Sequence, residues 1–342
     1  MESKSSSVTT TWKTPFEVSV TIKIPELISS TSSTLGTPTI SQENLFSRQP
    51  QFSLSESTSM FSLSSLAINT FGWQTALSLA VTSKLVYESK SVVERTAQDI
   101  LGLNNCKFID VDDTQCFIAS FANGVLIAFR GTESLGDWLS NLNILSTTKE
   151  YGVVHKGFYN GFVDVKQFLK QELDRFSPNR ILLTGHSLGG ALATVAAAEW
   201  SESYQITGVY TFGQPAVGKG KFSAFFDTHY RDKFFRFVNN DDIVPRVPPS
   251  YQHVGKLFHF GAHSELKLRT EAMTDKVNDI GPKMMSEAEF DYLRAQIFTQ
   301  RTSQNHNFAT ESLHTTSLEG LFPSVSSHDL NEYIRKIKAK IL

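Results

Sequence analysis

A single ten-residue segment constrains the fold more than any other part of the chain. Residues 181–190 read ILLTGHSLGG, an apolar run that leads into a G-x-S-x-G motif, and an Ala-rich stretch follows at 191–202. The apolar run is typical of a buried parallel strand, and the Ala-rich stretch is typical of a helix that packs on a sheet. The segment therefore predicts a strand, a sharp turn and a helix, which together form a unit of α/β proteins.

The turn between this strand and this helix has a chemical use. A G-x-S-x-G turn in that setting lifts the serine hydroxyl, here that of Ser187, to a position that a substrate carbonyl can reach. Gly185 and Gly189 lack side chains, so the helix can approach the strand closely. The N–H of Leu188 follows the nucleophile and points to where an attacked carbonyl becomes negative. We therefore predict a nucleophilic Ser187 and an oxyanion-hole donor at Leu188.

A serine nucleophile needs a base to take its proton, and the base needs an acid to orient it. In folds that carry this turn, the acid and then the histidine follow the serine along the chain. Asp241 and Asp242 come directly after an apolar strand at 233–238, and Pro245 prevents that strand from continuing. On this argument either aspartate is a candidate for the acid.

Among the nine histidines, His328 is the favoured candidate for the base. It lies just before an amphipathic helix, whose apolar positions are Leu330, Tyr333, Ile334, Ile337 and Ile341. A histidine at the start of a terminal helix that packs on the sheet is well placed to reach Ser187. His186 lies inside the turn itself, His155 precedes Ser187, and the remaining six histidines lack a clear strand-loop-helix setting.

Several blocks of the sequence, in the same order, resemble the fungal-type (class 3) triacylglycerol lipase family of α/β-hydrolases. Besides GHSLGG at 185–190, they are AFRGT at 128–132, DWLSNL at 137–142, VHKGF at 154–158, TFGQPAVG at 211–218 and NDDIVP at 240–245. The resemblance extends from about residue 67 to the C-terminus. It implies an α/β-hydrolase fold, with a mostly parallel central sheet and helices on both faces, and an enzyme that cleaves carboxylic esters of lipids.

The resemblance also assigns roles to residues. The acid of the family directly precedes Ile-Val-Pro, which selects Asp242 over Asp241, and the family's base near the C-terminus is followed by a tyrosine, as His328 is by Tyr333. The residue after Arg-Gly, here Thr132, supplies the second oxyanion-hole donor.

The family's lid falls at Leu135, Trp138 and Leu139, which share one face of a short helix because they are spaced i, i+3 and i+4. An amphipathic flap over the pocket and a core helix are equally compatible with this spacing.

Two parts of the chain lie outside the blocks that carry the resemblance. Residues 1–65 form a Ser/Thr-rich N-terminal extension that we predict to be partly mobile, with a strictly alternating segment at 16–24 that predicts one edge strand. Residues 66–342 form the lipase domain. Within it, residues 266–318 exceed the usual loop length and predict an insertion with a helix at 286–301. Such a cap would be able to select a polar-headed lipid over a triglyceride.

Composition narrows the partners and the location of the protein. The net charge of −2 gives no electrostatic reason for nucleic-acid binding, and no run approaches the ~20 apolar residues of a transmembrane helix. Residues 1–14 lack the apolar core of a signal peptide. We predict a cytoplasmic or peripheral membrane protein, held at a lipid surface or droplet by apolar contact. The Ser/Thr enrichment keeps an organelle transit peptide as an alternative, and the oligomeric state is not predicted.

Cys106 and Cys116 are the only cysteines, and we expect two buried thiols on strands joined at residues 112–113.

The sequence therefore predicts a serine hydrolase of lipid esters, specifically a triacylglycerol lipase that needs no metal or organic cofactor. A phospholipase A1 or monoacylglycerol esterase with the same residues is one alternative. A non-catalytic lipid-binding scaffold with the same fold is the other.

Overall fold

The computed structural model describes Glu56 and residues 60–67, 70–122, 124–268, 281–304 and 323–341. The edge strand expected at 16–24 lies outside the described residues, as do residues 269–280 and 305–318 of the expected insertion. The proposed boundary of the lipase domain at residue 66 falls within a short 3-10 helix, η1 (Leu63–Ala67), in which Ser65 and Leu66 are buried.

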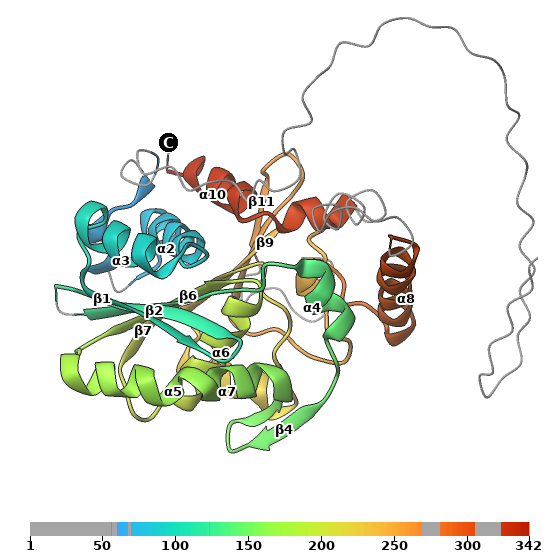
Figure 1. Cartoon of the computed structure of the whole chain (residues 1–342), viewed down its shortest axis with the longest axis horizontal. Helices are drawn as coiled ribbons and strands as arrows, with labels where there is room; N and C mark the ends of the chain where they lie inside the picture. Colours follow the sequence, from blue (N-terminus) through green and yellow to red (C-terminus); the bar gives the residue numbers. More distant parts are fainter. Residues whose placement is uncertain are drawn as a thin grey trace, which may run out of the picture. The chain divides into compact units, whose positions relative to one another are not determined.

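An eight-stranded sheet forms the centre of the described fold (Figure 1). In spatial order its strands are β1 (Asn104–Val111), β2 (Thr114–Phe121), β3 (Gly124–Phe129), β6 (Ile181–His186), β7 (Ile206–Phe212), β9 (Phe234–Asn239), β10 (Lys256–Phe260) and β11 (Leu266–Leu268). The five strands from β3 to β10 are parallel to one another, while β1, β2 and β11 pair antiparallel at the edges. The sheet is therefore mostly parallel, as predicted. A second, antiparallel sheet contains β4 (Ser146–Lys149), β5 (Gly152–His155) and β8 (Gly218–Lys219).

Helices cover both faces of the central sheet (Figure 1). One face carries α2 (Trp73–Leu85), α3 (Lys90–Arg95), the π-helical turn η2 (Thr96–Ile100) and α10 (Leu330–Lys338). The other face carries α5 (Lys156–Phe176), α6 (Leu188–Glu199) and α7 (Lys221–His229). Short 3-10 helices, η3 (Val244–Arg246) and η5 (Pro323–His328), lie in the loops that follow β9 and precede α10. This arrangement is the α/β-hydrolase fold that the sequence predicts.

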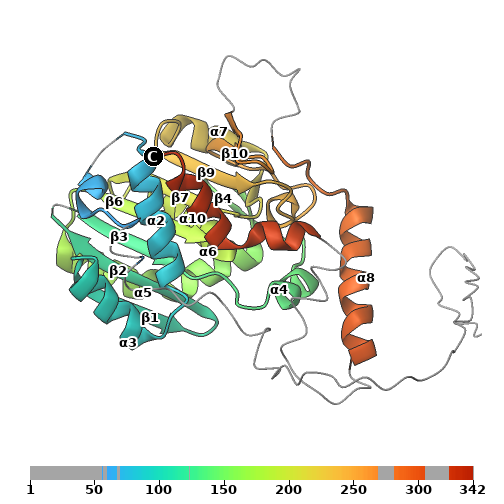
Figure 2. The same ribbon diagram turned by 90° about the horizontal axis from the view of Figure 1, so that it is seen from above.

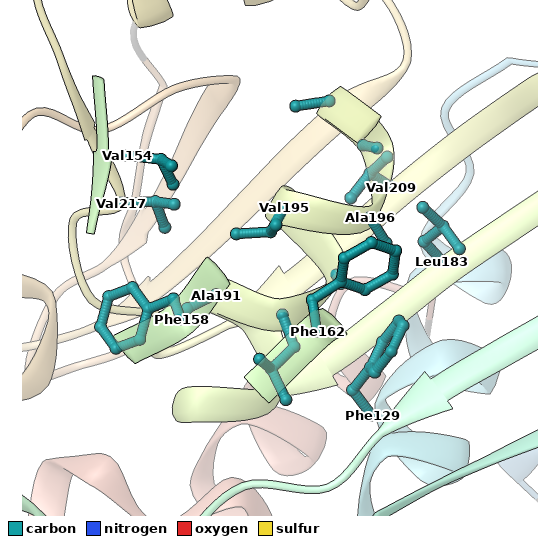
Figure 3. Packing of buried hydrophobic residues seen from close by; sticks show 14 of the residues in the cluster. Phe129, Val154, Phe158, Phe162, Leu183, Ala191, Val195, Ala196, Val209 and Val217 are labelled. Atoms are coloured by element: carbon teal, nitrogen blue, oxygen red, sulfur yellow. The ribbon is translucent and has the colours of Figure 1, made fainter. Parts of the chain in front are cut away.

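Alternation along the central strands divides the core into two layers. On β3, Val125, Ile127 and Phe129 face the α5–α6 layer, whereas Leu126 and Ala128 face the α2–α10 layer. Figure 3 shows Phe129 and Phe162 among the side chains that fill the first layer. A strand buried on both faces favours apolar side chains in both directions, which explains why β3 and residues 181–183 of β6 appear in the sequence as continuous apolar runs.

Two helices outside these layers lie side by side (Figure 2). They are α4 (Leu135–Asn141), in the region expected to form the lid, and α8 (Glu287–Gln304), in the expected insertion. The guanidinium Nε of Arg294 on α8 donates to the carbonyl of Ser140 on α4 over 3.2 Å. Apolar side chains of α8, including Phe290 and Leu293, are buried in the same cluster as the core of the α5–α6 layer. The described part of the insertion is thus packed against the lid region.

The two cysteines occupy neighbouring strands, as expected, and both are buried free thiols. Cys116 on β2 pairs with Ile109 on β1, so Cys106 is not its cross-strand neighbour. Burial raises the pKa of the Cys106 thiol to about 12, which keeps it protonated and unreactive.

Across the ranges that the structure describes, no helix combines the length and the apolar character needed to cross a membrane.

Candidate functional site

The turn at Ser187 has the strained geometry that the motif predicts. Ser187 lies between β6 and α6 with φ of 58° and ψ of −130°, a backbone region that non-glycine residues rarely adopt. Its N–H donates to the carbonyl of Phe212 over 2.9 Å. A Cβ atom on Gly185 would lie 2.3 Å from the carbonyl carbon of Gly189, and one on Gly189 would lie 2.1 Å from the carbonyl oxygen of Phe129. The two glycines therefore let β6, α6 and β3 meet at the turn.

His328 and Asp242 form a buried pair close to this turn. The Nδ1 atom of His328 lies 2.9 Å and 3.0 Å from the two carboxylate oxygens of Asp242, whose side chain is 0% exposed. A carboxylate only accepts, so Nδ1 of His328 carries the proton and its Nε2 is free to accept one. That Nε2 atom is buried and has no hydrogen-bond partner among the described residues. The pair therefore presents an unused proton acceptor inside the protein.

Two further donors hold the Asp242 carboxylate. The backbone N–H of Val244 donates to Oδ1 over 2.9 Å, and the hydroxyl of Tyr333 donates to Oδ2. Burial and the charge of Asp242 raise the pKa of Tyr333 well above its usual value, so its hydroxyl stays protonated and remains a donor. The Tyr333 oxygen in turn accepts from the N–H of Asn239 at the end of β9. The carboxylate is thereby fixed with respect to both β9 and α10.

The neighbouring Asp241 has a different environment. Its side chain is exposed and accepts from the hydroxyl of Ser327 over 2.7 Å and from the amide of Asn240 over 2.9 Å. Of the two aspartates, only Asp242 contacts His328. The sequence alone kept both open, because both follow the same strand.

Gly213 is a site residue that the sequence reasoning did not single out. Its φ is +58°, and a Cβ atom there would lie 2.8 Å from Oδ2 of Asp242 and 2.9 Å from Nδ1 of His328. The position must therefore lack a side chain for the pair to form. Its signal in the sequence was the TFGQP block, in which the glycine directly follows β7.

His186 joins the pair to the serine turn. Its Nε2 lies 2.9 Å from the main-chain carbonyl of His328, and the two imidazole rings lie with their centroids 4.4 Å apart. Ser187, the next residue, is 3% exposed. The structure thus brings together the turn, the acid and the histidine that the sequence selected.

The segment expected to supply the second oxyanion donor also approaches the serine. A Cβ atom on Gly131 would lie 2.7 Å from the carbonyl oxygen of His186 and 3.2 Å from Cβ of Ser187. Thr132, half-buried, is the next residue, and Leu188 is the first residue of α6. The segment of Gly131 and the first turn of α6 therefore both lie beside Ser187.

The three expected lid residues differ in exposure. Leu139 is completely buried, whereas Leu135 and Trp138 are half-buried and pack against the α5–α6 core. The Trp138 ring stacks on Phe158, with centroids 6.5 Å apart and an interplanar angle of 15°. In this state α4 therefore directs its apolar face inward.

His155, one of the other histidines, has a structural environment. Its Nε2 hydrogen-bonds the carbonyl of Asn143 over 2.7 Å, and its Nδ1 accepts from the N–H of Phe158 as the N-cap of α5.

Comparison with known proteins agrees with this geometry. Residues 126–252 match the family described as lipase (class 3). The chain is 29% identical to the triacylglycerol lipase OBL1 of Arabidopsis thaliana over 259 residues, which cover 56% of this chain and 50% of the relative. It is 34% identical to the secreted mono- and diacylglycerol lipase 1 of Fusarium solani over 139 residues, 38% of this chain and 41% of the relative. The matches thus span half or less of these two relatives.

The fold has a similar counterpart among solved structures. Lipase II from Rhizopus niveus superposes with a TM-score of 0.50 at 21% identity, and the match covers 60% of this chain and 89% of that structure. The family match covers the turn at Ser187, the strand before Gly131 and the loop of Asp242. The part of the chain that carries Ser187 and Asp242 is therefore similar to the class 3 lipase family, and the fold is that of α/β-hydrolases.

Proposed function

We propose that the protein is a serine hydrolase that cleaves carboxylic ester bonds of lipids, with Ser187, His328 and Asp242 as its triad. The observation that carries this proposal is the buried His328–Asp242 pair. The Nε2 atom of His328 has no hydrogen-bond partner among the described residues, and the main-chain carbonyl of His328 is hydrogen-bonded to His186, the residue before Ser187. A buried imidazole held by a carboxylate on one nitrogen is suited to take a proton on the other.

The proposed reaction follows from these positions. Ser187 Oγ attacks the ester carbonyl carbon while its proton passes to Nε2 of His328, and Asp242 stabilises the imidazolium that forms. The N–H groups of Leu188 and Thr132 stabilise the oxyanion of the tetrahedral intermediate. The intermediate collapses to an acyl-serine when His328 returns the proton to the leaving alcohol. A water molecule then repeats the sequence, releasing the fatty acid and restoring Ser187.

For the substrate we propose acylglycerols. The Arabidopsis relative is named a triacylglycerol lipase and the Fusarium relative a mono- and diacylglycerol lipase, so the comparisons favour a glycerol ester and include both degrees of acylation. We propose that the protein meets its substrate at a lipid interface. The packing of α8 against α4 is the feature by which this chain would adjust the substrate range, because α8 adds apolar side chains beside the lid region.

Purified protein tests the proposal when it is assayed on tri-, di- and monoacylglycerols, phosphatidylcholine and a dissolved p-nitrophenyl butyrate. We expect acylglycerol turnover, and we expect Ser187→Ala to abolish hydrolysis of every substrate while the thermal melt stays cooperative. Residual activity within about tenfold of wild type would exclude the serine mechanism, because the loss of a triad nucleophile costs far more. Lipid binding without any turnover by the wild type would favour the scaffold alternative.

A further inference from the structure

His186, the residue between Gly185 and Ser187, makes two hydrogen bonds that no part of the proposed reaction requires. Its Nδ1 lies 3.1 Å from the hydroxyl of Tyr87, and its Nε2 lies 2.9 Å from the main-chain carbonyl of His328. The side chain is 7% exposed. Gly185 and Gly189 are the positions of the turn that must lack a side chain. His186 lies between Gly185 and Ser187, and its imidazole is large, buried and held by two defined partners, which calls for an explanation of its own.

The partners determine where the proton of this imidazole sits. A carbonyl oxygen only accepts, so Nε2 of His186 must carry the hydrogen and donate it to His328. Burial and the neighbouring His328 lower the pKa of His186 well below its usual value, so the ring is neutral and its Nδ1 is an acceptor. The Tyr87 hydroxyl must therefore donate to Nδ1. Burial raises the pKa of Tyr87 far above its usual range, so that hydroxyl keeps its proton.

Tyr87 joins this chain of hydrogen bonds to the strand end that precedes Thr132. The backbone of Gly131 lies against the Tyr87 hydroxyl, since a Cβ atom on Gly131 would lie 2.1 Å from that oxygen. The guanidinium of Arg130 lies over the Tyr87 ring, 5.6 Å from its centroid. Tyr87, His186 and His328 are therefore linked in one hydrogen-bonded series, which packs against Gly131.

We propose that His186 and Tyr87 are positioning residues for the proposed hydrolysis, with Tyr87 donating to His186 and His186 donating to the main chain of His328. The proposal rests on the proposed function, because it assigns the relative placement of the base, the nucleophile turn and the oxyanion segment to one hydrogen-bonded series. Asp242 fixes the His328 side chain at Nδ1, and His186 fixes the backbone from which that side chain extends. Neither residue would touch the substrate or exchange a proton with it.

Steady-state kinetics on a dissolved short-chain ester test the series with a pair of matched variants. Glutamine at position 186 retains a donor near the place of Nε2, whereas methionine has a similar size and no donor. We expect His186→Met to lower kcat by about tenfold, the rate equivalent of one lost hydrogen bond, with KM nearly unchanged. We expect His186→Gln to stay within about threefold of wild type. Equal losses in both variants would overturn the positioning role and leave only packing.

Tyr87→Phe is the mildest variant and tests the other end of the series. It retains the ring against Arg130 and removes only the hydroxyl. We expect kcat to fall by about three- to tenfold, with a melt close to that of wild type. An unchanged kcat would show that the hydroxyl does not contribute to the placement of His328.

A measurement independent of turnover separates this proposal from the proposed function. In two-dimensional ¹H–¹⁵N spectra of the histidine rings of the full chain, His186 should appear as the neutral form with its proton on Nε2. Tyr87→Phe should shift the Nδ1 resonance and leave the tautomer unchanged. A proton on Nδ1 of His186 would overturn the series even in an active enzyme. A wild type without turnover that shows the expected tautomer would retain the series and reject the hydrolysis.

Discussion

Asp241 and Asp242 are adjacent carboxylates in one loop, but they differ in burial and in hydrogen-bond partners. Asp242 is completely buried and accepts from His328, Tyr333 and a backbone N–H, whereas Asp241 is exposed and accepts from Ser327. A carboxylate that orients an imidazole selects its tautomer, so an amide at the same place favours the wrong one.

We therefore expect Asp242→Asn to lower kcat by orders of magnitude, roughly ten-thousand-fold in the well-studied case of such a triad. Asp241→Asn is the matched control and should stay within a few-fold of wild type. Turnover of a dissolved ester by both variants, with melts to establish folding, decides between them. If the change at Asp241 proved the damaging one, the acid would be misassigned.

Gly213 offers a second test at the residue scale, because the chain supplies a control glycine with a similar positive φ. Gly213 and Gly220 have φ of +58° and +60°, but a Cβ on Gly213 would press on the His328–Asp242 pair and a Cβ on Gly220 would meet nothing within 4 Å. Both alanine variants should lose about 1–2 kcal/mol of stability because of the positive φ, and Gly213→Ala should lose more because its Cβ presses on the buried pair. Only Gly213→Ala should lose more than a hundredfold in kcat. Parallel assays and denaturant titrations measure the two effects, and similar activities in the two variants would contradict the crowding argument.

The site residues that can be predicted from the sequence are those that belong to a local sequence motif. Ser187 has a local signature, and Asp242 has a local IVP signature supplied by the family. Tyr87 and Gly213 contribute through contacts with residues far away in the sequence, 99 positions in the case of Tyr87 and His186. No periodicity or motif encodes such a contact, so these roles became visible only with the fold.

At the scale of elements, α4 and α8 act as a pair. Trp138 on α4 stacks on Phe158 of α5, and Arg294 of α8 donates to the carbonyl of Ser140 on α4. If α4 moves to open the site, this stack must break, and its apolar face becomes available to a lipid surface.

We expect Trp138→Ser to lower hydrolysis of an emulsified long-chain ester far more than hydrolysis of a dissolved short-chain ester. The reason is that an exposed lid face contributes at an interface, whereas the triad acts on both substrates. Phe168→Ser changes an aromatic side chain on α5 that is 45% exposed and serves as the control. Rates on both substrates decide the matter, and equal losses for Trp138→Ser would identify α4 as a core helix.

The sequence predicted most elements, and its errors have local causes. The insertion helix expected at 286–301 is α8 (Glu287–Gln304), on which Phe290, Leu293 and Ile297 are buried. The start of α5 at Lys156 is less apparent from the sequence. Two glycines, Gly157 and Gly161, weaken the helical signal there, while His155 caps the helix with a side chain that is not a usual cap residue.

At the scale of the whole molecule, buried histidines make stability depend on pH. Burial lowers the pKa of His155, and of His186, His253 and His259, below the value in an unfolded chain. Above the unfolded value of about 6.5 both states are neutral and stability is complete. As the pH falls below about 6.5, the unfolded chain takes up protons that the folded protein refuses, so stability is lost until the folded pKa is reached.

We expect the melting temperature to fall between pH 7.5 and pH 5, and to fall less in His155→Asn. Asparagine retains an N-cap acceptor for α5 while removing the titrating group. One such group contributes at most about 1.4 kcal/mol per pH unit, a difference of a few degrees in a protein of this size. His263→Asn changes an exposed histidine and should follow wild type. If the melting temperatures of wild type, His155→Asn and His263→Asn fell equally with pH, His155 would not contribute to the pH dependence of stability.

The position of α10 in the chain has a consequence for the timing of activity during synthesis. Ser187 and Asp242 emerge from the ribosome well before His328, which lies 86 residues after the acid, and before Tyr333, which lies 91 residues after it. The histidine is in place only when α10 has docked on α2 and Tyr333 has reached the Asp242 carboxylate. A nascent chain would therefore carry a complete serine turn and remain unable to attack the lipids around it.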